Sequence, residues 1–417
     1  MLDINYIREN KEIVKKACRD KQLDDQVVDK LLQIDEKRRE LKKQVDEIRT
    51  QINQHAKEIK TKVAGGQKPT EADKEKGKKL KQELKAVEPK LKEVEEKWQE
   101  LMYHIPNVPA KEVPIGKDES GNVVIRQVGK PKEFDFTPKP HEEIMEKLGW
   151  LDTKRAVRLG GFRAYFLRGE GLLLEQAILR YALHLLADEG FVPMGVPVMV
   201  NEEAMWGTGY FPWGSEDHYK TQDNQYLTGT AEVALTAYYK GETLKEADLP
   251  IQMCGISPCF RREVGSYGKD TKGVIRVHQF NKVEQVVYTV ADETETQKWH
   301  EKMTGLAERL LKDLNLPYQV LLMCTGDMGA GQRKKYDIET WFPAQNKYRE
   351  THSASYFNDF QARRLNIRYQ AKDGSLKYVY TLNNTMAATP RLLAAIVENY
   401  QTPDGKIEIP EVLKRWM

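Results

Sequence analysis

The stretch "CFRREVGSYGKDTKGVIRVHQFNKVEQ", residues 259–285, decides how this chain is interpreted. Its two ends alternate apolar and charged residues as β-strands do, and the glycine-rich segment "VGSYGKDTKG" lies between them. The pattern predicts a long hairpin with arginines, glutamates and a phenylalanine on one face. Because alternate side chains of paired strands project to the same side, these charged and aromatic groups would share one face of the hairpin.

The sequence around the hairpin mixes short strands with helices. Amphipathic helices are predicted at 170–190 and 388–401, and strand-like runs include "FVPMGVPVMV", "PIQMCGISPCF", "KYDIETWFP" and "KYVYTLNNT". Strands follow strands without βαβ alternation, which predicts an α+β fold with an antiparallel sheet flanked by helices. Neither GxGxxG nor GxxxxGK(S/T) occurs, which disfavours a Rossmann or P-loop nucleotide site.

The N-terminal region has a heptad pattern. After Val27, one slot of the pattern is Arg38 and the others are apolar: Leu31, Ile34, Leu41, Val45, Ile48, Ile52, Ile59 and Val63. A second set comprises Leu80, Leu84, Val87, Leu91, Val94, Trp98 and Leu101. Two such helices predict a long antiparallel coiled-coil hairpin over about residues 27–101, roughly 50 Å long.

The break between the two helices carries its own signals. Gly65 and Gly66 end the first helix, and Thr70 with Asp73 three residues later matches a capping box that starts the second. Pro89 lies inside the second helix, where we expect a local kink.

The tip of the expected hairpin is basic. Ten lysines and five acidic residues lie between Lys57 and Lys85, so this part carries about +5, whereas the whole chain carries +3. A lysine-rich face can be simply a solvated coiled-coil surface. The alternative is an arm that contacts the phosphates of a nucleic acid.

The chain of 417 residues is long enough for two or three domains. The proline- and glycine-rich linker at 104–122 predicts an N-terminal domain at 1–110 and a second domain at 111–417. No run of 18 apolar residues and no signal peptide occurs, so a cytoplasmic location is expected. The four cysteines form no CxxC, which favours buried, reduced thiols over disulfides or a cysteine zinc site.

Three stretches resemble the motifs of class II aminoacyl-tRNA synthetases. Residues 172–200 resemble motif 1, residues 258–285, with "FRRE" and "HQFNKVE", resemble motif 2, and residues 380–400, with "NNTMAATPR", resemble motif 3. With the N-terminal hairpin, "TAE" at 230–232, "KYRE" and "DFQARRLNIRY", the chain resembles seryl-tRNA synthetases over essentially its whole length.

The resemblance implies a ligase that activates L-serine with ATP to seryl-adenylate and transfers serine to the 3′ end of tRNA(Ser). Selenocysteine tRNA is a second acceptor that it leaves open. The hairpin would read the long variable arm of the tRNA, and motif 1 would form the face of a homodimer.

The resemblance also implies ATP-binding roles for residues of the 259–285 hairpin and for residues that follow it. Arg261 would clamp the α-phosphate and the serine carboxylate, as a planar guanidinium is suited to do. Phe280 would stack on adenine, with Arg391 over the other face and reaching the γ-phosphate. Glu263 would read the adenine amino group, and Arg276 would assist at the phosphates. Arg261, Glu263 and Arg391 are the expected catalytic residues. The other matching ATP positions are Val277, Glu350, Thr351, His352 and Ser353.

Serine recognition follows from the same resemblance. Glu284 and the Thr230 region would hold the ammonium, while Glu232 and Thr385 would meet the hydroxyl. Asn383 is a further matching position. A site that hydrogen-bonds a hydroxyl rejects alanine because its polar groups are then left unpaired.

A metal is implied as well. Glu350 and Ser353 match positions that hold Mg²⁺ or Mn²⁺ bridging the phosphates, with hard oxygen ligands for a hard cation. No zinc is expected, because no cysteine lies at the serine-site motifs.

The chain departs from the common family pattern in two places. His352, Tyr356 and Phe357 stand where small or polar residues are common, and Asn384, Thr385 and Met386 replace the usual small residues of motif 3.

Two alternative functions remain open from the sequence. One is a synthetase-like ligase that charges a carrier protein, although such relatives lack the coiled-coil arm. The other is a non-catalytic coiled-coil scaffold that binds RNA. The presence together of Arg261, Glu263, Glu284, Glu350 and Arg391 disfavours the scaffold.

Overall fold

The computed structural model describes residues 1–265, 270 and 272–417. Much of the predicted glycine-rich loop, at 266–269 and 271, therefore lies outside the described residues. The chain divides into two compact units. A helical unit comprises Leu2–Arg19 and Leu23–Pro106, and a larger body comprises Asn107–Met417 with Met1 and Asp20–Gln22. No helix among the described residues is long and apolar enough to span a bilayer.

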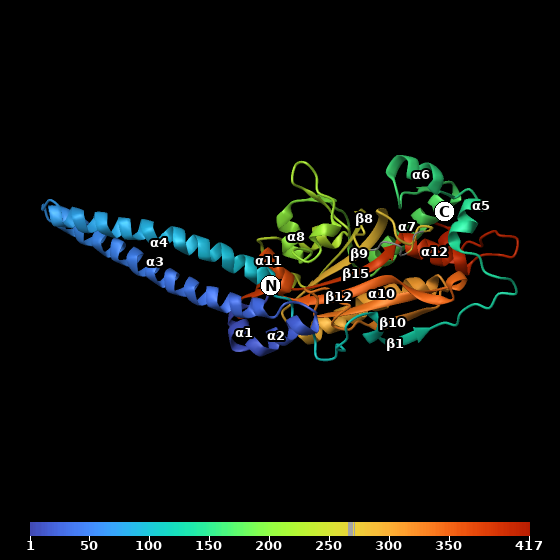
Figure 1. Ribbon diagram of the computed structural model, residues 1–417, viewed down its shortest axis with the longest axis horizontal. Helices are drawn as coiled ribbons and strands as arrows, with labels where there is room; N and C mark the ends of the chain where they lie inside the picture. Colours follow the sequence, from blue (N-terminus) through green and yellow to red (C-terminus); the bar gives the residue numbers. More distant parts are fainter. Residues whose placement is uncertain (266–269, 271) are drawn as a thin grey trace. The chain divides into compact units, whose positions relative to one another are not determined.

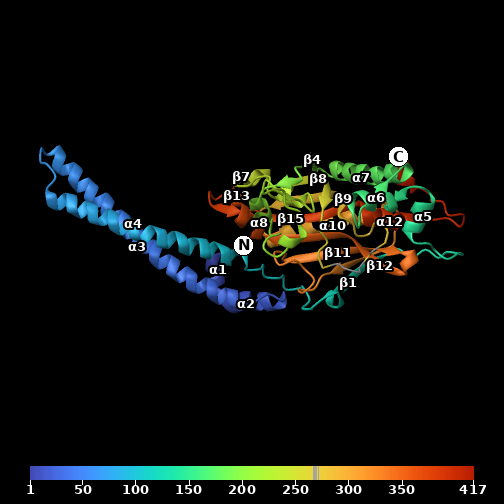
Figure 2. The same ribbon diagram turned by 45° about the horizontal axis from the view of Figure 1, so that its top comes forward.

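The helical unit is built on two long helices. Short helices α1 (Ile4–Glu9) and α2 (Lys11–Asp20) precede α3 (Gln26–Ala64) and α4 (Glu71–Tyr103), which lie side by side in Figures 1 and 2. The predicted heptad positions are buried or half-buried, apart from Val63, which is 54% exposed. That part of the prediction was wrong, because the facing helix begins only at Glu71 and leaves the last turn of α3 without an apolar partner.

The predicted capping box is confirmed at the start of α4. The Asp73 N–H donates to Thr70 Oγ1 at 3.2 Å, and the Thr70 N–H donates to Asp73 Oδ2 at 2.9 Å. Lys62 Nζ on α3 donates to Asp73 Oδ1 at 2.9 Å, which ties the two helices together at the turn. α4 continues as one helix through Pro89.

The polar slot of the heptad pattern has a partner on the facing helix. The Arg38 guanidinium lies 4.4 Å from the centre of the Trp98 ring and pairs with Asp35 at 3.0 Å. A cation over an indole face is favourable, so Arg38 fits the seam without an apolar side chain.

An eight-stranded sheet forms the centre of the larger body (Figure 1). Its strand order is β1-β10-β11-β12-β15-β9-β8-β4, and every pair is antiparallel except β4 with β8. The strands are β1 (Val123–Val128), β10 (Tyr318–Leu322), β11 (Lys334–Phe342), β12 (Lys347–Asn358), β15 (Tyr380–Ala388), β9 (Gln279–Thr289), β8 (Ile251–Phe260) and β4 (Val192–Gly195). The predicted α+β fold with an antiparallel sheet is confirmed.

Smaller sheets and nine helices complete the described part of this body. The short strands are β2 (Leu151–Asp152) with β3 (Phe166–Leu167), β5 (Met199–Val200) with β6 (Tyr226–Leu227), and β7 (Thr243–Lys245) with β13 (Arg368–Gln370) and β14 (Leu376–Tyr378). The helices are α5 (His141–Lys147), α6 (Thr153–Gly160), α7 (Glu170–Asp188), α8 (Glu202–Thr208), α9 (Glu232–Thr236), α10 (Glu293–Asp313), α11 (Phe360–Leu365), α12 (Thr389–Asn399) and α13 (Glu411–Lys414).

Some boundaries differ from the sequence expectation. The run "FVPMGVPVMV" forms two short strands, β4 and β5, and Pro197 lies between them. The helix predicted at 388–401 is α12, and a further short helix, α13, follows it.

One face of the sheet is covered by α10. Asn384 Nδ2 on β15 and Gln285 Nε2 on β9 both donate to the Met303 carbonyl of α10, at 2.6 and 3.4 Å. Thr385 and Glu284, the next residues along these strands, are register partners and project from the opposite face. The unusual motif residues Tyr356, Phe357 and Met386 are all buried in the core.

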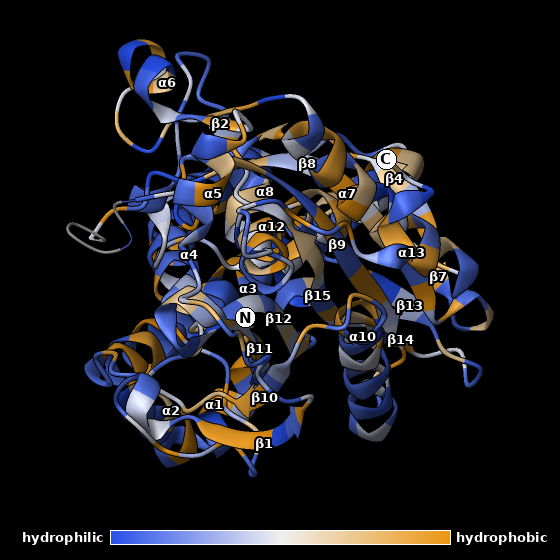
Figure 3. Cartoon of the chain, turned by 90° about the vertical axis from the view of Figure 1, so that its right-hand side faces the viewer, coloured by the Kyte–Doolittle hydropathy of each residue, from blue (hydrophilic) through white to orange (hydrophobic). Residues whose placement is uncertain are grey.

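The outer edge of the sheet is apolar. β1 is one edge strand, and Figure 3 draws it largely in orange. Val123, Val124 and Ile125 are each between 38% and 49% exposed. This edge lies several strands away from β9 and β15, which carry the candidate site.

Candidate active site

A cavity opens where the end of β8 and the strands β9, β12 and β15 meet the start of α12. The lining residues that had been predicted from the sequence are Arg261, Glu263, Arg276, Val277, Phe280, Glu350, Thr351, Ser353, Thr385 and Arg391. Five other predicted residues, Thr230, Glu232, Glu284, Asn383 and His352, are not part of this lining.

The floor of the cavity follows the period of a strand. Phe280, Lys282 and Glu284 alternate along β9, so all three project from the face opposite α10. The Arg261 guanidinium, just after β8, lies 5.2 Å from the centre of the Phe280 ring, and its Nη2 donates to the Gly229 carbonyl at 3.3 Å. The aromatic face and the guanidinium therefore border the same space.

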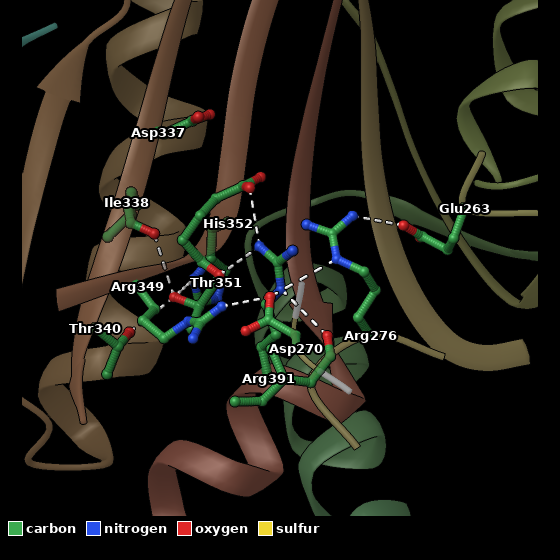
Figure 4. Close-up of polar contacts among 12 residues, drawn as sticks. Glu263, Asp270, Arg276, Asp337, Ile338, Thr340, Arg349, Thr351, His352 and Arg391 are labelled. Carbon is green, nitrogen blue, oxygen red and sulfur yellow. Dashed lines mark hydrogen bonds and ion pairs between the residues drawn. The ribbon is translucent and has the colours of Figure 1, made fainter. Parts of the chain in front are cut away.

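Arginines from three segments gather at one end of the cavity (Figure 4). Arg276 Nη1 donates to Glu263 Oε2 at 2.6 Å. Arg349 Nη2 donates to Asp270 Oδ2 at 2.6 Å, and Arg276 Nε lies 3.7 Å from the same oxygen. A guanidinium presents donors in a planar fork, so this end is suited to hold phosphate oxygens.

Arg391 closes that end from α12. Its Nη1 donates to the Glu350 backbone carbonyl and to Glu350 Oε2, both at 2.9 Å, and its Nε donates to the Ile275 carbonyl at 3.4 Å. Partial burial opposes ionisation of the Glu350 carboxyl, but Arg391 and Lys335 outweigh it and hold the Glu350 pKa well below its usual value. Glu350 is thus kept as a carboxylate.

A register shift decides which residues of β12 face the cavity. Glu350 pairs with Glu339 and Ser353 pairs with Asp337, with one irregular position, Thr351, between them. In a regular strand, residues three apart project to opposite faces, but the bulge places Glu350 and Ser353 on the same side. Both line the cavity.

His352 lies elsewhere. It pairs with Ile338, is buried and has its Nδ1 2.8 Å from Thr351 Oγ1. Burial lowers the pKa of His352 to about 4, so the ring is neutral near pH 7.

Next to the cavity floor is a buried polar network. Thr230 Oγ1 donates to Glu284 Oε2 at 3.2 Å and accepts from Lys282 Nζ at 3.1 Å. Lys282 also forms a close ion pair with Glu284. Burial raises the Glu284 pKa, while Lys282 and Thr230 oppose that shift. The side chains of Thr230, Lys282 and Glu284 therefore contact one another beside Arg261.

Glu232 extends this network. It accepts from Tyr210 Oη at 2.8 Å and from Gln361 Nε2 at 3.0 Å. Burial and the charge of Glu284 raise its pKa, and the two hydrogen bonds oppose the rise. Thr385 is 4% exposed and is the register partner of Glu284, whereas Asn383 is buried two residues back along β15.

Sequence reasoning missed several residues of the site. Lys282 was inside the quoted hairpin, two positions from Glu284 on the same face, so strand periodicity could have found it. The Asp270–Arg349 contact joins residues 79 apart, and no local pattern predicts it. No group of three or more histidine, cysteine or acidic side chains with metal-binding geometry occurs within residues 1–265, 270 and 272–417.

Comparison with known proteins identifies the family. The seryl-tRNA synthetase N-terminal domain family matches residues 1–109, and the class II tRNA synthetase core domain family (G, H, P, S and T) matches residues 216–400. A serine--tRNA ligase from Deinococcus radiodurans is 45% identical over 100% of this chain and 97% of its own length. The chain belongs to the seryl-tRNA synthetase family.

Other seryl-tRNA synthetases agree. One from Kosmotoga olearia is 43% identical over 100% of this chain and 99% of its own length. The crystal structure of seryl-tRNA synthetase from Pyrococcus horikoshii complexed with ATP has a TM-score of 0.91 and 39% identity, with 100% of this chain and 98% of that chain covered. The resemblance found in the sequence motifs is therefore confirmed along the whole chain.

Proposed function

We propose that this chain is a serine--tRNA ligase that activates L-serine with ATP and transfers the serine to tRNA(Ser). The observation that carries the proposal is the cavity itself. An aromatic ring, Phe280, and the guanidinium groups of Arg261, Arg276 and Arg391 border one space in a chain of this family. Beside them lies a buried network of Thr230, Lys282 and Glu284.

The first step joins two anions. The serine carboxylate attacks the α-phosphorus of ATP, a P–O bond forms, and pyrophosphate leaves. Arg261 lies between the Phe280 ring and the Thr230 network, so it can bridge the carboxylate and the α-phosphate. Stabilisation of charge that develops on the phosphate is the main contribution expected of such a group. Arg276 and Arg391, at the other end, would receive the β- and γ-phosphates.

The adenine would lie on Phe280. Arg391 is the proposed second cover of the base, and Glu263 the acceptor for its amino group. In the free protein Glu263 accepts from Arg276 at 2.6 Å, so reading the base would require this ion pair to loosen. Val277, Thr351 and Ser353 complete the proposed ATP contacts. His352 is proposed only as support, since its side chain is buried against Thr351 rather than against the cavity.

Serine would occupy the space between Arg261 and Thr385. Glu284 and the Thr230 region offer acceptors for the ammonium group, and the buried Thr385 and Glu232 are the proposed partners of the hydroxyl. Asn383 is a supporting residue in this proposal. Lys282 already neutralises Glu284 in the free protein, so a bound ammonium would compete with or displace that lysine.

Mg²⁺ fits the oxygen donors at the phosphate end. The Glu350 carboxylate and the Ser353 hydroxyl line the same cavity, and Asp337, the register partner of Ser353, has a buried Oδ1 without a hydrogen-bond partner among the described residues. Oxygen ligands of this kind suit Mg²⁺ when substrate phosphates complete the shell. When bound, the ion would act as a Lewis acid on the phosphates. No zinc has a place in the proposed reaction.

The helical unit is the proposed tRNA-binding part. Its lysine-rich segment, 57–85, would contact phosphates of the long variable arm. Selenocysteine tRNA remains a second possible acceptor for such an arm. The proposed domain division, 1–110 and 111–417, follows this separation of tasks, and the proposed setting is the cytoplasm, where tRNA and ATP are available.

A homodimer is proposed on the motif 1 side. Six large apolar side chains in this region are exposed, with Leu159 the extreme case at 81%: Val157, Leu159, Phe162, Phe166, Leu172 and Leu173. Large exposed apolar groups mark interaction surfaces, and a two-fold closed interface is the commonest arrangement. A fully active monomer in sedimentation experiments at working concentration would contradict this proposal.

The decisive test of the function is serine-dependent exchange of pyrophosphate into ATP, followed by transfer of serine to tRNA. We expect both activities. Exchange without transfer would indicate a ligase for a carrier protein, and the absence of exchange would indicate a non-catalytic scaffold.

A further inference from the structure

A buried histidine links the candidate site to a second part of α12. His141, at the start of α5, is 1% exposed, and Glu398, near the end of α12, is fully buried. His141 Nδ1 lies 3.0 Å from Glu398 Oε1, and the His141 backbone N–H donates to the same oxygen at 3.3 Å. Glu398 Oε2 accepts from the Ala344 N–H at 3.1 Å. Neither residue lines the cavity.

The other ring nitrogen of His141 contacts the segment at residues 274–276, which precedes β9. The Val274 backbone N–H lies 3.3 Å from His141 Nε2. A backbone N–H can only donate, so Nε2 is the acceptor and the ring proton lies on Nδ1, where it is donated to Glu398. The histidine therefore bridges a helix and a loop through two bonds of opposite direction.

These contacts form a closed circuit around the phosphate end of the cavity. Val274 is followed by Ile275, whose carbonyl accepts from Arg391 Nε at 3.4 Å, and then by Arg276. Arg391 and Glu398 both belong to α12, seven residues apart. The circuit thus runs from Arg391 to the 274–276 segment, through His141 to Glu398, and back along the helix.

Gly273 leaves room for this arrangement. Its φ is +68°, and a Cβ at this position would lie 2.2 Å from His141 Nε2. Any side chain here would push the ring away from the Val274 N–H. The backbone is therefore shaped to let the histidine approach the segment that carries Arg276.

We propose that His141 is a positioning residue that sets the distance between Arg276 and Arg391, and so prepares the cavity for the triphosphate of ATP. The proposal rests on the proposed function for the identity of the nucleotide. His141 would act through the Val274 bond, while its bond to Glu398 would serve the stability of the fold. Removing the Val274 bond would let the 274–276 segment drift, so the arginines would meet the phosphates in a poorer geometry.

Two conservative variants separate the two bonds. In His141→Asn the side-chain amide replaces Nδ1 and can still donate to Glu398, but no atom reaches Val274. In His141→Gln the longer side chain places an oxygen near the position of Nε2 and can accept from the Val274 N–H. The matched control is His300→Asn, because His300 is equally buried but donates from Nε2 to the Ala354 carbonyl at 3.0 Å, on the α10 side of the sheet.

The measurements are the Kd for ATP by titration calorimetry without serine, the KM values for ATP and serine in pyrophosphate exchange, and the melting temperature. We expect His141→Asn to weaken ATP binding about tenfold, as the loss of one buried hydrogen bond allows, with the KM for serine unchanged. The Kd of His141→Gln for ATP should stay within about threefold of the wild-type value. Its melting temperature should fall further than that of His141→Asn, because it loses the bond to Glu398. His300→Asn should lower the melting temperature and leave the Kd for ATP unchanged.

A double-mutant cycle tests the route of the effect. In an Arg276→Ala background, His141→Asn should cost little more ATP affinity, since the group that it positions is gone. The proposal is overturned if His141→Asn binds ATP like wild type, if it weakens ATP and serine equally, or if its effect is fully additive with Arg276→Ala. If wild-type protein binds ATP but shows no exchange with serine, the proposed function fails, while the calorimetric comparison still decides the role of His141.

Discussion

The coiled-coil hairpin and the cavity both depend on charge, but they place it in opposite surroundings. On α3 and α4, ion pairs such as Arg49–Glu88 join side chains that are 57% and 43% exposed. At the cavity floor, Lys282 and Glu284 are 7% and 2% exposed. Exposed pairs contribute little individually, whereas a buried charge that loses its partner is strongly destabilising. The charges of the hairpin should therefore act independently, and those of the cavity as a unit.

The largest expected effect separates the two regions altogether. Replacing residues 30–100 by a short linker should leave serine-dependent pyrophosphate exchange nearly intact, because none of the cavity residues lies there. Transfer of serine to tRNA should collapse, since the lysine-rich segment is lost. Comparing exchange rates with tRNA charging rates checks this. Normal charging by the armless protein would remove the proposed role of the hairpin.

The next effect concerns the energetic coupling between Lys282 and Glu284 at the cavity floor. Lys282→Met should destabilise the protein by about 3–5 kcal/mol, because it leaves the Glu284 carboxylate buried without its cation. Adding Glu284→Gln should recover much of that loss. Denaturant unfolding of the two single variants and the double variant measures the coupling. Simple addition of the two losses would show that the pair is not a unit.

Arg261→Ala should slow adenylate formation by on the order of 3 kcal/mol, roughly a hundredfold, because its contact strengthens as charge develops on the phosphate. Arg261→Lys should lose less, and serine binding should change less than the rate in both variants. The control is Arg262→Ala, an exposed neighbour whose Nη1 donates to the Glu216 carbonyl at 2.9 Å. Exchange kinetics that are equal for the Arg261 and Arg262 variants would rule out the clamp.

Thr385→Val should reduce the preference for serine over alanine by about tenfold, because it keeps the shape and deletes a hydrogen bond to the hydroxyl. The loss should come mainly from poorer use of serine. Thr304→Val is the matched control, since Thr304 is fully buried on α10 and donates to the His300 carbonyl at 2.7 Å. Equal losses for serine and alanine would make Thr385 a packing residue.

The smallest effect lies on the hairpin. Lys79 and Lys81 are exposed, so each alanine substitution should weaken tRNA binding by only about 1 kcal/mol or less and reduce the salt dependence by about one phosphate contact. The double variant should show the sum of the two losses. Binding isotherms at several salt concentrations check both points, and strong coupling between the two lysines would contradict the comparison.

Local patterns carried the sequence predictions that succeeded. The capping box of Thr70 and Asp73 and the heptad seam are set by residues three or four apart, so they can be read directly. Val63 fails because its burial depends on where the facing helix begins. Within residues 259–285, strand periodicity places Phe280 and Glu284 on one face. The same periodicity also predicts Lys282 on that face.

The rest of the site depends on contacts between distant segments. Arg349 meets Asp270, and His141 meets both Val274 and Glu398, through the sheet and helices rather than through any local repeat. The position of His352 depends on a single irregular residue in β12, which has no sequence signature of its own. Motif resemblance placed His352 beside Glu350 and Ser353 in the sequence but could not give the face to which its side chain points.

Two of the irregular positions in the central strands, Thr351 and Met386, make the length of these strands a functional property. Thr351 lets Glu350 and Ser353 share the cavity, and Met386, between the paired positions Thr385 and Ala387, does the same for Thr385 and Ala388. Deleting one residue at Thr351 or at Met386 would restore a regular pleat. One residue of the affected pair, Glu350 with Ser353 or Thr385 with Ala388, would then point into the core on the α10 side. Substitutions along β12 and β15 should therefore be tolerated far better than insertions or deletions. A redesign of this pocket has to keep the length of both strands.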